Sequence, residues 1–320
     1  MKKLFFFIII SIFLILSLSI AVLSISGYET NRFNNIISKK INENNKYVTV
    51  SLKKIKFKFD YKDISLFVET KNPKLNYQNL DIPIEDIKVY INFLSLFKSN
   101  IQIDKINITT KNMNINQLKK IIIKSKPSNL NSLIINKVTK GNLVTNIELF
   151  LDKNLKIKNF IATGNINNMT VEIKKNLILD KTSFTFFADA TDILIKNIKS
   201  SSNGILLNNG TLKIEKNEKI VVKSDFSTIT NINKDNISNY LTLIKNLKYL
   251  NENISFTTNI NHNLDYVFDK TLKILNFSYK SKGLIEDLKI VLNKKIKSDF
   301  LKNDINTINF QNTNFNLDYN

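Results

Sequence analysis

From about Tyr47 to its last residue, the chain alternates apolar and polar positions, with Ile, Leu, Val or Phe followed by Lys, Asn, Asp, Ser or Thr. A two-residue period places successive side chains on opposite faces of a β-strand, so one face is apolar and the other is polar. Amphipathic helices are too few to cover the apolar face. The pattern therefore predicts a mainly β protein whose apolar face has a covering other than helices.

The clearest strands lie between residues 87 and 108, where the alternation breaks at 94–97 and then resumes. The phase also slips by one residue at Lys53 and Lys54, which predicts a bend there. We expect an apolar trough along one side of these strands. Its predicted lining is Val48, Val50, Ile87, Val89, Ile91, Ile101 and Ile103. Ordinary packing in a sheet core is the alternative for each of these residues.

Lys2 and Lys3 precede an apolar run from Leu4 to about Ile25. The run is long enough to cross a bilayer as a helix, since about 20 residues span roughly 30 Å of hydrocarbon. A cleaved secretory signal is the alternative, but its apolar core usually has about 7 to 15 residues. We therefore expect a retained anchor over residues 1–26, a cytoplasmic N-terminus from the positive-inside rule, and one exported domain over residues 27–320.

Three short segments show helical spacing instead of alternation: residues 30–43, 116–124 and 236–250. Pro127 follows the second segment and ends it, and Asp235 is a candidate N-cap for the third. The strands between these helices share a local pattern without a strict repeat. The sheet is therefore expected to grow strand by strand, as in a solenoid.

The turns must form largely without glycine, because the chain has six Gly and three Pro. Asn tolerates left-handed backbone, so the segments NNKY, NINN, NNGT and NENI are candidate turns. A genome rich in A and T is an equally weighted cause of the abundant Ile, Lys and Asn.

The formal net charge of +20 indicates attraction to polyanions such as anionic lipid headgroups, lipopolysaccharide or nucleic acid. Lys is interleaved along the strands, which favours a solvated face over a nucleic-acid site, and we expect no nucleic-acid partner. The chain has no Cys, which excludes disulfides, thiolate metal sites and a Cys nucleophile.

Candidate catalytic chemistry is sparse. The only histidine, His262, has Asp265 nearby in sequence but no identifiable nucleophile, so we interpret it as a solvent-facing residue at a strand end. A single His with scattered carboxylates is a weak metal-binding set. The sequence has no Walker loop, G-x-S-x-G or Rossmann fingerprint. We expect no enzyme activity, no catalytic residue, no metal and no cofactor.

The first 125 residues carry a family resemblance. The apolar run, the helix after it, the NPKL strand and above all the segment IPIEDIKVYINFLSLFKSNIQIDKINITTKNMNINQLKKI resemble the amino-terminal region of AsmA-like proteins, the family that includes AsmA, TamB and YhdP. The resemblance implies a single-pass protein of the Gram-negative inner membrane. It also implies a periplasmic, long and curved antiparallel β-groove with a taco-like cross-section and a few short amphipathic helices, related to the chorein bridge-like lipid transfer proteins.

Members of this family are usually much longer, and the sequence stops within a strand pattern. A fragment, a short paralogue, and a protein whose C-terminal end docks on an outer-membrane or periplasmic partner are the three expectations, since an open strand edge invites pairing.

The function that the resemblance implies is shielding of phospholipid acyl chains during transport between the inner and outer membranes. A chain of about sixteen carbons gains on the order of 10 kcal/mol from burial before ordering costs, at about 0.8 kcal/mol per methylene. Two alternatives stay open. One is a structural or assembly factor for outer-membrane proteins or envelope biogenesis, built as a closed sheet sandwich. The other is binding of polyanions through the lysine face.

Overall fold

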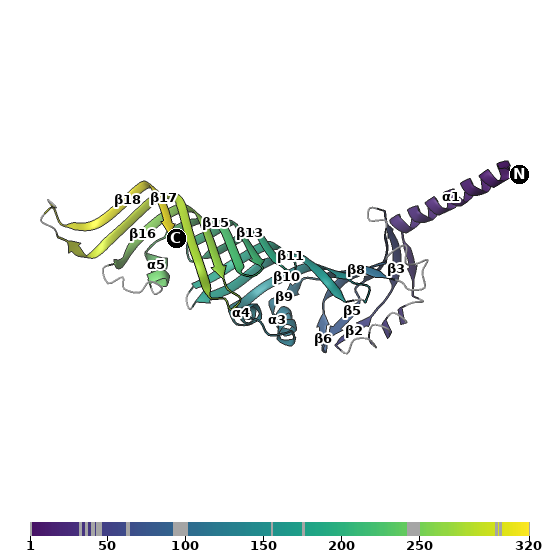
Figure 1. The fold of residues 1–320 in the computed structure, drawn as a ribbon. Helices are drawn as coiled ribbons and strands as arrows, with labels where there is room; N and C mark the ends of the chain where they lie inside the picture. Colours follow the sequence, from purple (N-terminus) through teal and green to yellow (C-terminus); the bar gives the residue numbers. More distant parts are fainter. Residues whose placement is uncertain are drawn as a thin grey trace. The chain divides into compact units, whose positions relative to one another are not determined.

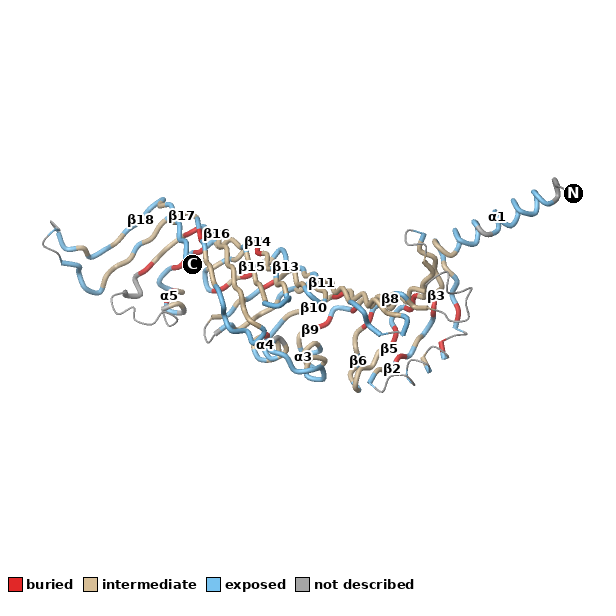
Figure 2. The backbone as a smooth tube through the Cα atoms, in the orientation of Figure 1, coloured by how far each residue is buried: buried red, intermediate tan, exposed pale blue. Residues whose placement is uncertain are grey.

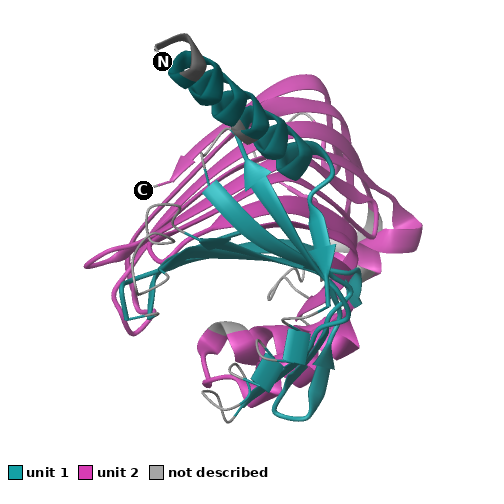
Figure 3. Cartoon of the chain, turned by 90° about the vertical axis from the view of Figure 1, so that its right-hand side faces the viewer, with its two compact units in different colours: residues 1–113, 144–162 teal, residues 114–143, 163–320 magenta. Residues whose placement is uncertain are grey.

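The computed structural model describes residues 2–31, 34–35, 38–39, 42, 47–61, 65–91, 102–154, 156–174, 177–241, 250–297, 300 and 303–319. Within it the chain divides into two compact units (Figure 3). Unit 1 comprises residues 1–113 and 144–162, and unit 2 comprises residues 114–143 and 163–320. The sequence pattern had indicated one domain over residues 27–320 and held no marker for this division.

The dominant element is one antiparallel sheet (Figure 1), with the strand order β1-β3-β4-β7-β8-β10-β11-β12-β13-β14-β15-β16-β17-β18 and with β9 paired to β10. A second sheet has the order β2-β5-β6. The prediction of a mainly β, antiparallel chain with few helices is confirmed. The strands up to β9 are β1 (Tyr28–Thr30), β2 (Val48–Ser51), β3 (Ile55–Asp60), β4 (Ser65–Lys71), β5 (Lys74–Tyr77), β6 (Leu80–Ile82), β7 (Ile84–Ile91), β8 (Ile103–Thr110) and β9 (Met113–Asn114).

From β10 onward each strand pairs with its neighbour in sequence, as expected for a sheet that grows strand by strand. These strands are longer than most of those before them. They are β10 (Val138–Leu151), β11 (Ile157–Lys174), β12 (Leu177–Ala188), β13 (Asp192–Ser202), β14 (Ile205–Lys216), β15 (Ile220–Ile232), β16 (Leu250–Phe268), β17 (Ile274–Ile296) and β18 (Ile305–Tyr319).

The first helix, α1 (Lys2–Ile25), contains the segment Phe5–Ile25, which is long and apolar enough to cross a membrane and has no buried residues. A signal sequence would pass the same test. Gly27 follows the end of the helix, where its φ of +68° suits glycine and its N–H donates to the Val22 carbonyl at 3.0 Å. A Cβ at Gly27 would lie 2.8 Å from the Phe57 carbonyl oxygen, so a larger residue would push α1 away from β3.

One long hairpin supplies strands to both sheets of unit 1. The same register runs from the pair Leu66–Ile91, between β4 and β7, to the pair Tyr77–Leu80, between β5 and β6. Gln78 and Asn79 close the hairpin with φ values of 49° and 65°, which is the geometry of a tight primed turn. Unit 1 is therefore organised around a single continuous strand pair.

This hairpin bends sharply where β4 gives way to β5 and β6 gives way to β7. Pro73 lies at the first junction and Pro83 at the second, and neither can donate a ladder hydrogen bond. Asn72 adopts a φ of 49°, and its N–H donates to the Glu85 carbonyl at 2.7 Å. The bend separates β5 and β6 from the large sheet. They form the second sheet together with β2. The slip predicted at residues 53–54 also has a structural cause, because the chain passes there from β2 in one sheet to β3 in the other.

Four successive strands, β11 to β14, each carry one residue in left-handed backbone conformation: Asn168, Lys181, Asn197 and Asn209, with φ between 51° and 57°. Register shifts accompany three of them, between Asp180 and Ser183, between Ile195 and Ile198, and between Asn208 and Thr211. Such bulges bend a strand and increase its twist, and the strands of unit 2 are visibly curved (Figure 3).

The candidate Asn turns therefore need correction. NINN and NNGT each place a left-handed Asn inside a strand, β11 and β14 respectively, and NENI lies inside β16, so none of the three is a turn. NNKY lies mostly outside the described residues. The conformational argument for Asn was right, but the hydrogen-bonded neighbours on both sides keep these segments within the sheet.

Unit 2 contains three described helices. α3 (Ile115–Lys124) corresponds to the helix expected near 116–124, and α4 (Asn129–Lys137) was not expected. α5 (Lys234–Leu241) lies in the segment expected to be helical over 236–250, but Leu250 already begins β16 and residues 242–249 lie outside the described chain. In the segment expected to be helical over 30–43, the described residues 34, 35, 38, 39 and 42 are helical, while Thr30 ends β1 instead of starting the helix.

Closed core is scarce in the described part of the chain. Figure 2 shows buried positions scattered along the strands, and most apolar strand residues are half-buried. The buried hydrophobic residues are Val50, Ile55, Ile84, Met113, Val138, Ile232, Ile237 and Ile254. A closed sandwich buries one face of every strand, so these eight residues are too few for one.

Candidate functional site

The strand register sorts the large sheet of unit 1 into an apolar and a polar face, because directly opposed residues of antiparallel strands share a face. One row across β3, β4, β7, β8 and β10 consists of Phe57, Val68, Val89, Ile106 and Leu149. The adjacent row, on the other face, consists of Lys56, Glu69, Lys88, Asn107 and Glu148. We call these the apolar face and the polar face of unit 1.

Four of the seven predicted trough residues come together on the apolar face of unit 1. Ile87, Val89 and Ile91 follow one another along β7, and Ile103 of β8 is opposite Ile91. All four are half-buried. The change of phase between Ile103 and Ile106 comes from a register shift that leaves Asp104 as an extra residue, so a bulge returns Ile103 to the apolar side.

The other three predicted residues do not join this group. Val48 and Val50 belong to β2 in the second sheet, where they are opposite Tyr77 and Leu75. Val50 is only 6% exposed and is therefore a packed residue, as in the alternative reading. Ile101 lies outside the described residues.

Sequence reasoning missed part of the apolar face. The alternation at residues 55–61 and 64–68 was visible, but the phase of a strand does not say which neighbour it pairs with. The register adds eight half-buried residues to the face: Phe57, Phe59, Leu66, Val68, Ile106, Ile108, Ile147 and Leu149.

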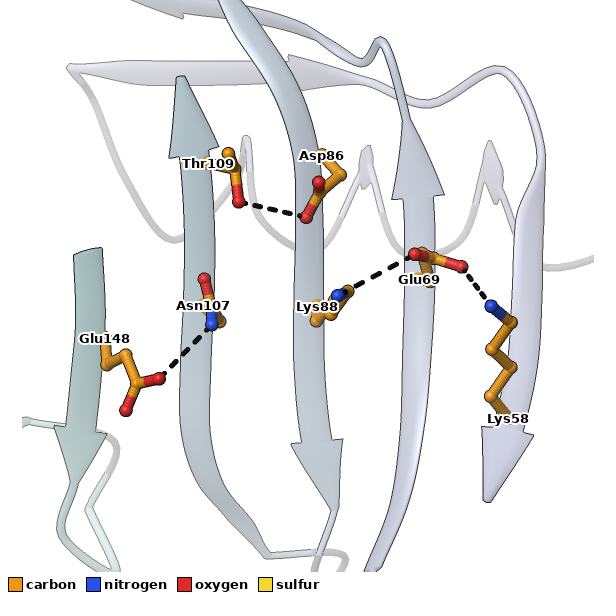
Figure 4. Close-up of polar contacts among 7 residues, drawn as sticks. All are labelled: Lys58, Glu69, Asp86, Lys88, Asn107, Thr109 and Glu148. Atoms are coloured by element: carbon orange, nitrogen blue, oxygen red, sulfur yellow. Dashed lines mark hydrogen bonds and ion pairs between the residues drawn. The ribbon is translucent and has the colours of Figure 1, made fainter. Parts of the chain in front are cut away.

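Cross-strand pairs occupy the polar face of unit 1 (Figure 4). Lys58 Nζ lies 3.0 Å from Glu69 Oε2, and Lys88 Nζ lies 4.0 Å from Glu69 Oε1. The Glu69 side chain is only 7% exposed, so two ammonium groups compensate one nearly buried carboxylate. Two lysines and one glutamate do not provide a nucleophile together with a general base. The arrangement therefore indicates stabilisation of the sheet and not catalysis.

The same face continues with a second group of pairs. The Asn107 amide donates to Glu148 Oε1 at 3.4 Å, and Lys105 Nζ lies 3.7 Å from Glu148 Oε2 (Figure 4 draws the first of these). Lys105 also lies over the Tyr90 ring, 4.4 Å from its centroid. The Thr109 hydroxyl donates to Asp86 Oδ1 at 3.3 Å. These polar side chains pair with one another across neighbouring strands, whereas the side chains of the apolar face offer only hydrocarbon contact.

In unit 2 one sheet face carries Phe226, His262, Tyr266 and Tyr279, and we call it the apolar face of unit 2. It has an aromatic cluster on β15, β16, β17 and β18. Tyr266 contacts Phe268 and Phe277 at centroid distances of 5.6 Å and 4.6 Å, and Phe277 contacts Tyr319 at 5.8 Å. Aromatic pairs of this kind contribute about 0.5–1.5 kcal/mol beyond their buried area. The rings are half-buried except for Tyr319, which is exposed, so they form a continuous surface and not a closed core.

His262 belongs to this aromatic surface, which corrects its interpretation as a solvent-facing residue at a strand end. It lies in the middle of β16, half-buried and stacked on Phe226 at 4.7 Å. Its Nε2 pairs with the Thr228 hydroxyl at 2.8 Å and its Nδ1 with the Tyr279 hydroxyl at 2.7 Å. Burial lowers the pKa of His262, because the charged ring loses hydration there.

Helix α5 covers one end of the apolar face of unit 2. Ile237 of α5 packs with Ile232 and Ile254 of the sheet, and Tyr240 joins the edge of this cluster. The Tyr240 hydroxyl donates to the Ser202 carbonyl at 2.7 Å, and burial raises the pKa of this phenol. Where α5 covers the sheet, the strand residues are buried: Ile232 is 1% exposed and Ile254 is 7% exposed.

The polar face of unit 2 has a shallow, open pocket of about 470 Å³, lined among others by Asp225, Asn263 and Lys280. Its side chains are largely engaged with each other. The Asn263 amide donates to Asp225, and Lys280 pairs with Asp318 at 3.2 Å. A group of three or more His, Asp or Glu side chains placed to hold a metal does not occur among the described residues.

No protein-family model, curated protein or solved structure matches this chain. Its candidate site is therefore defined by its own geometry: two apolar sheet faces, each backed by a polar face.

Proposed function

We propose that the chain is a single-pass protein anchored in the inner membrane by α1, with its bulk in the periplasm. In this proposal its apolar sheet faces form a curved groove that shields phospholipid acyl chains and contributes to their transport between the inner and outer membranes. This is the function that the resemblance to AsmA-like proteins implies. The observation that carries it is the half-buried apolar face of unit 1, directly behind an ion-paired polar face.

The energetics favour a ligand of hydrocarbon. A soluble monomer rarely exposes an apolar patch larger than a few hundred Å², and burial contributes roughly 25 cal/mol per Å². The apolar rows of unit 1 run over five strands with no buried residue among Phe57, Val68, Val89, Ile106 and Leu149. An acyl chain offers long, flexible, purely apolar contact and demands no hydrogen bonds from these side chains.

The anchor supports the same proposal from the N-terminal side. Most apolar side chains of α1 that the structure describes are exposed, and the helix leads through Gly27 directly into β1 of the large sheet. Lys2 and Lys3 precede it, which favours a cytoplasmic N-terminus and export of everything after Gly27. A bilayer supplies both the cover for α1 and the proposed cargo for the groove.

The test uses the full chain with a photoreactive benzophenone amino acid introduced in place of Val89 in one variant and Tyr90 in another. These neighbours point to opposite faces of β7, so they experience the same expression, anchoring and local backbone. After irradiation of intact cells, mass spectrometry is expected to find phospholipid attached at position 89 and none at position 90.

Equal labelling at both positions, or none at either, would contradict the proposal. Absence of lipid at position 89 together with a cross-link to another envelope protein would instead favour the assembly-factor role.

A further inference from the structure

The chain has one long segment without any acidic residue. Between Asp104 and Glu148 it contains eight lysines and no Asp or Glu: Lys105, Lys111, Lys119, Lys120, Lys124, Lys126, Lys137 and Lys140. Five of them, Lys119 through Lys137, lie on α3, on α4 or in the loop between the two helices. None of these five forms an ion pair with a described residue, whereas Lys58, Lys88 and Lys105 on the sheet all do.

The two helices form a capped hairpin. Asn114 and Gln117 make a capping box at the start of α3, with both bonds at 3.0 Å. The Asn131 amide at the start of α4 donates to the Ser125 hydroxyl at 2.9 Å and to the Lys126 carbonyl at 2.8 Å, which ties the second helix to the end of the first. The loop is therefore held in place by its own hydrogen bonds.

The hairpin is amphipathic and superficial. α3 has no buried residue, although Leu118 and Ile122 on one side are half-buried. Two large apolar side chains face outward: Ile123 is 63% exposed and Leu133 is 50% exposed. Lys119 and Lys120 lie one turn before Ile123, and Lys137 lies one turn after Leu133, so each exposed apolar side chain has ammonium groups on its own side of the helix.

We propose that the α3–α4 hairpin is a peripheral membrane-binding element that docks on an anionic bilayer surface. Lys120, Lys124 and Lys126 contact headgroup phosphates, and Ile123 and Leu133 enter the interfacial layer. This site is separate from the acyl-binding faces of the sheets, and it does not depend on the proposed transport function.

A bilayer fits the hairpin better than other polyanions. An interfacial helix combines lysines with outward aliphatic side chains, and its binding depends on both. Nucleic-acid sites pair basic residues with aromatic rings for base stacking, and neither α3 nor α4 contains an aromatic residue. The unpaired lysines supply the charge complementarity, and the two aliphatic side chains have no use at a phosphate backbone.

The absence of Cys allows a single label to report on the hairpin. Asn136→Cys carries an environment-sensitive NBD dye on the exposed side of α4, one turn from Leu133. The control variant, Ala190→Cys, carries the same dye in the exposed turn between β12 and β13 of the same unit. The full chain is held by α1 in nanodiscs, and phosphatidylglycerol is supplied in the disc, in added vesicles, or in neither. The dye at position 136 is expected to shift to the blue whenever phosphatidylglycerol is present, and the dye at position 190 is not. The shift is expected to be lost in about 1 M NaCl, where the Debye length is about 3 Å.

Two charge variants separate a local site from general basicity. K120Q/K124Q/K126Q removes three exposed hairpin lysines, and K196Q/K199Q/K216Q removes three exposed lysines from the strands of the same unit. Each lysine near an anionic surface is worth about fivefold in binding, so the hairpin triple is expected to weaken vesicle affinity on the order of 100-fold. The strand triple is expected to leave it nearly unchanged.

Equal weakening by both triples would overturn the proposal, and so would an unshifted dye at position 136 in the presence of phosphatidylglycerol. Binding of single-stranded RNA as tight as that of the vesicles would also overturn it, because it would assign the hairpin to a different partner. Photo-crosslinking at position 89 in the hairpin triple is expected to persist, so failure here and failure of acyl binding are distinguishable.

Discussion

His262 Nδ1 lies 2.7 Å from the Tyr279 hydroxyl on the next strand, within the aromatic surface of unit 2. The other ring nitrogen is engaged by Thr228, and the ring stacks on Phe226. A neutral imidazole satisfies both bonds, with one nitrogen donating and the other accepting. A protonated ring would have to donate from both nitrogens, and it would place a positive charge in a half-buried site.

This arrangement predicts a pH-dependent stability. The pKa of His262 in the folded chain lies below its ordinary value of about 6.5, so the unfolded chain binds a proton more readily. The stabilisation is complete above about pH 6.5 and is lost as pH falls toward the lowered pKa. Urea midpoints of the β-sheet circular dichroism signal are expected to be lower at about pH 5.5 than at about pH 7.5.

His262→Phe keeps the stacking on Phe226 and removes the titrating group. Because His262 is the only histidine in the chain, the difference between the two midpoints is expected to shrink markedly in this variant. An unchanged difference would show that other groups carry the pH dependence.

The apolar face of unit 1 makes a second prediction. Replacing Val89 and Ile91 together by Asp places two carboxylates among half-buried apolar side chains, where unpaired charge is strongly disfavoured. The anchored protein is expected to persist in the membrane but to lose most of the phospholipid that co-purifies after mild detergent extraction. Lys71→Asp, at an exposed position on β4, changes the net charge by the same amount and is expected to retain it. Equal lipid loss in both variants would indicate a general charge effect and contradict the prediction.

Glu69 provides a third prediction, on the polar face. Glu69→Ala leaves Lys58 and Lys88 without their shared carboxylate, and the Glu69 side chain is 7% exposed. The lysines are partly hydrated, so the expected loss in free energy of unfolding is about 1–3 kcal/mol. Urea denaturation measures it.

The pair Glu29–Lys54 is the matched control, since its two side chains are 48% and 66% exposed. Glu29→Ala is expected to cost less than about 1 kcal/mol. A similar loss in both variants would mean that burial of Glu69 adds nothing to its pairing.

The bulges of unit 2 make a fourth prediction. Asn197 adopts a φ of 57°, a conformation that glycine reaches freely and a β-branched residue does not. Asn197→Gly is therefore expected to be nearly neutral, while Asn197→Val is expected to cost about 1–2 kcal/mol in urea unfolding. Lys196→Val, at the neighbouring extended and exposed position, is expected to be tolerated; if it costs as much, backbone strain is not the cause.

The sequence was sufficient for the strands and insufficient for their pairing. Alternation alone identified Ile87, Val89 and Ile91 as residues of one face, because the period of a strand is a local property. It could not show that Val48 and Val50 belong to a different sheet, since nothing in their own segment shows that the hairpin bends at Pro73 and Pro83 and builds a second sheet there.

Two other features are present in the sequence, but the interpretation given to them differs from what the structure has. The interior Asn residues suggested turns, but the strands paired on both sides keep Asn168 and Asn209 within the sheet. The lysines are interleaved along the strands, but the acidic residues are not distributed in the same way. The local net charge along the chain identifies the stretch between Asp104 and Glu148, which has lysines and no acidic residue.

The closure at Gln78 and Asn79 has a distant effect. Because one register extends without interruption from this turn to the pair Leu66–Ile91, the two turn residues decide which side of β7 presents Val89. Lengthening the turn by one residue would offset β7 against β4 by one position. With β4 kept in place, Lys88 and Tyr90 would then lie on the face where hydrocarbon is proposed to lie. The face on which Val89 lies relative to β4 is thus set at the opposite end of the hairpin, beyond two prolines.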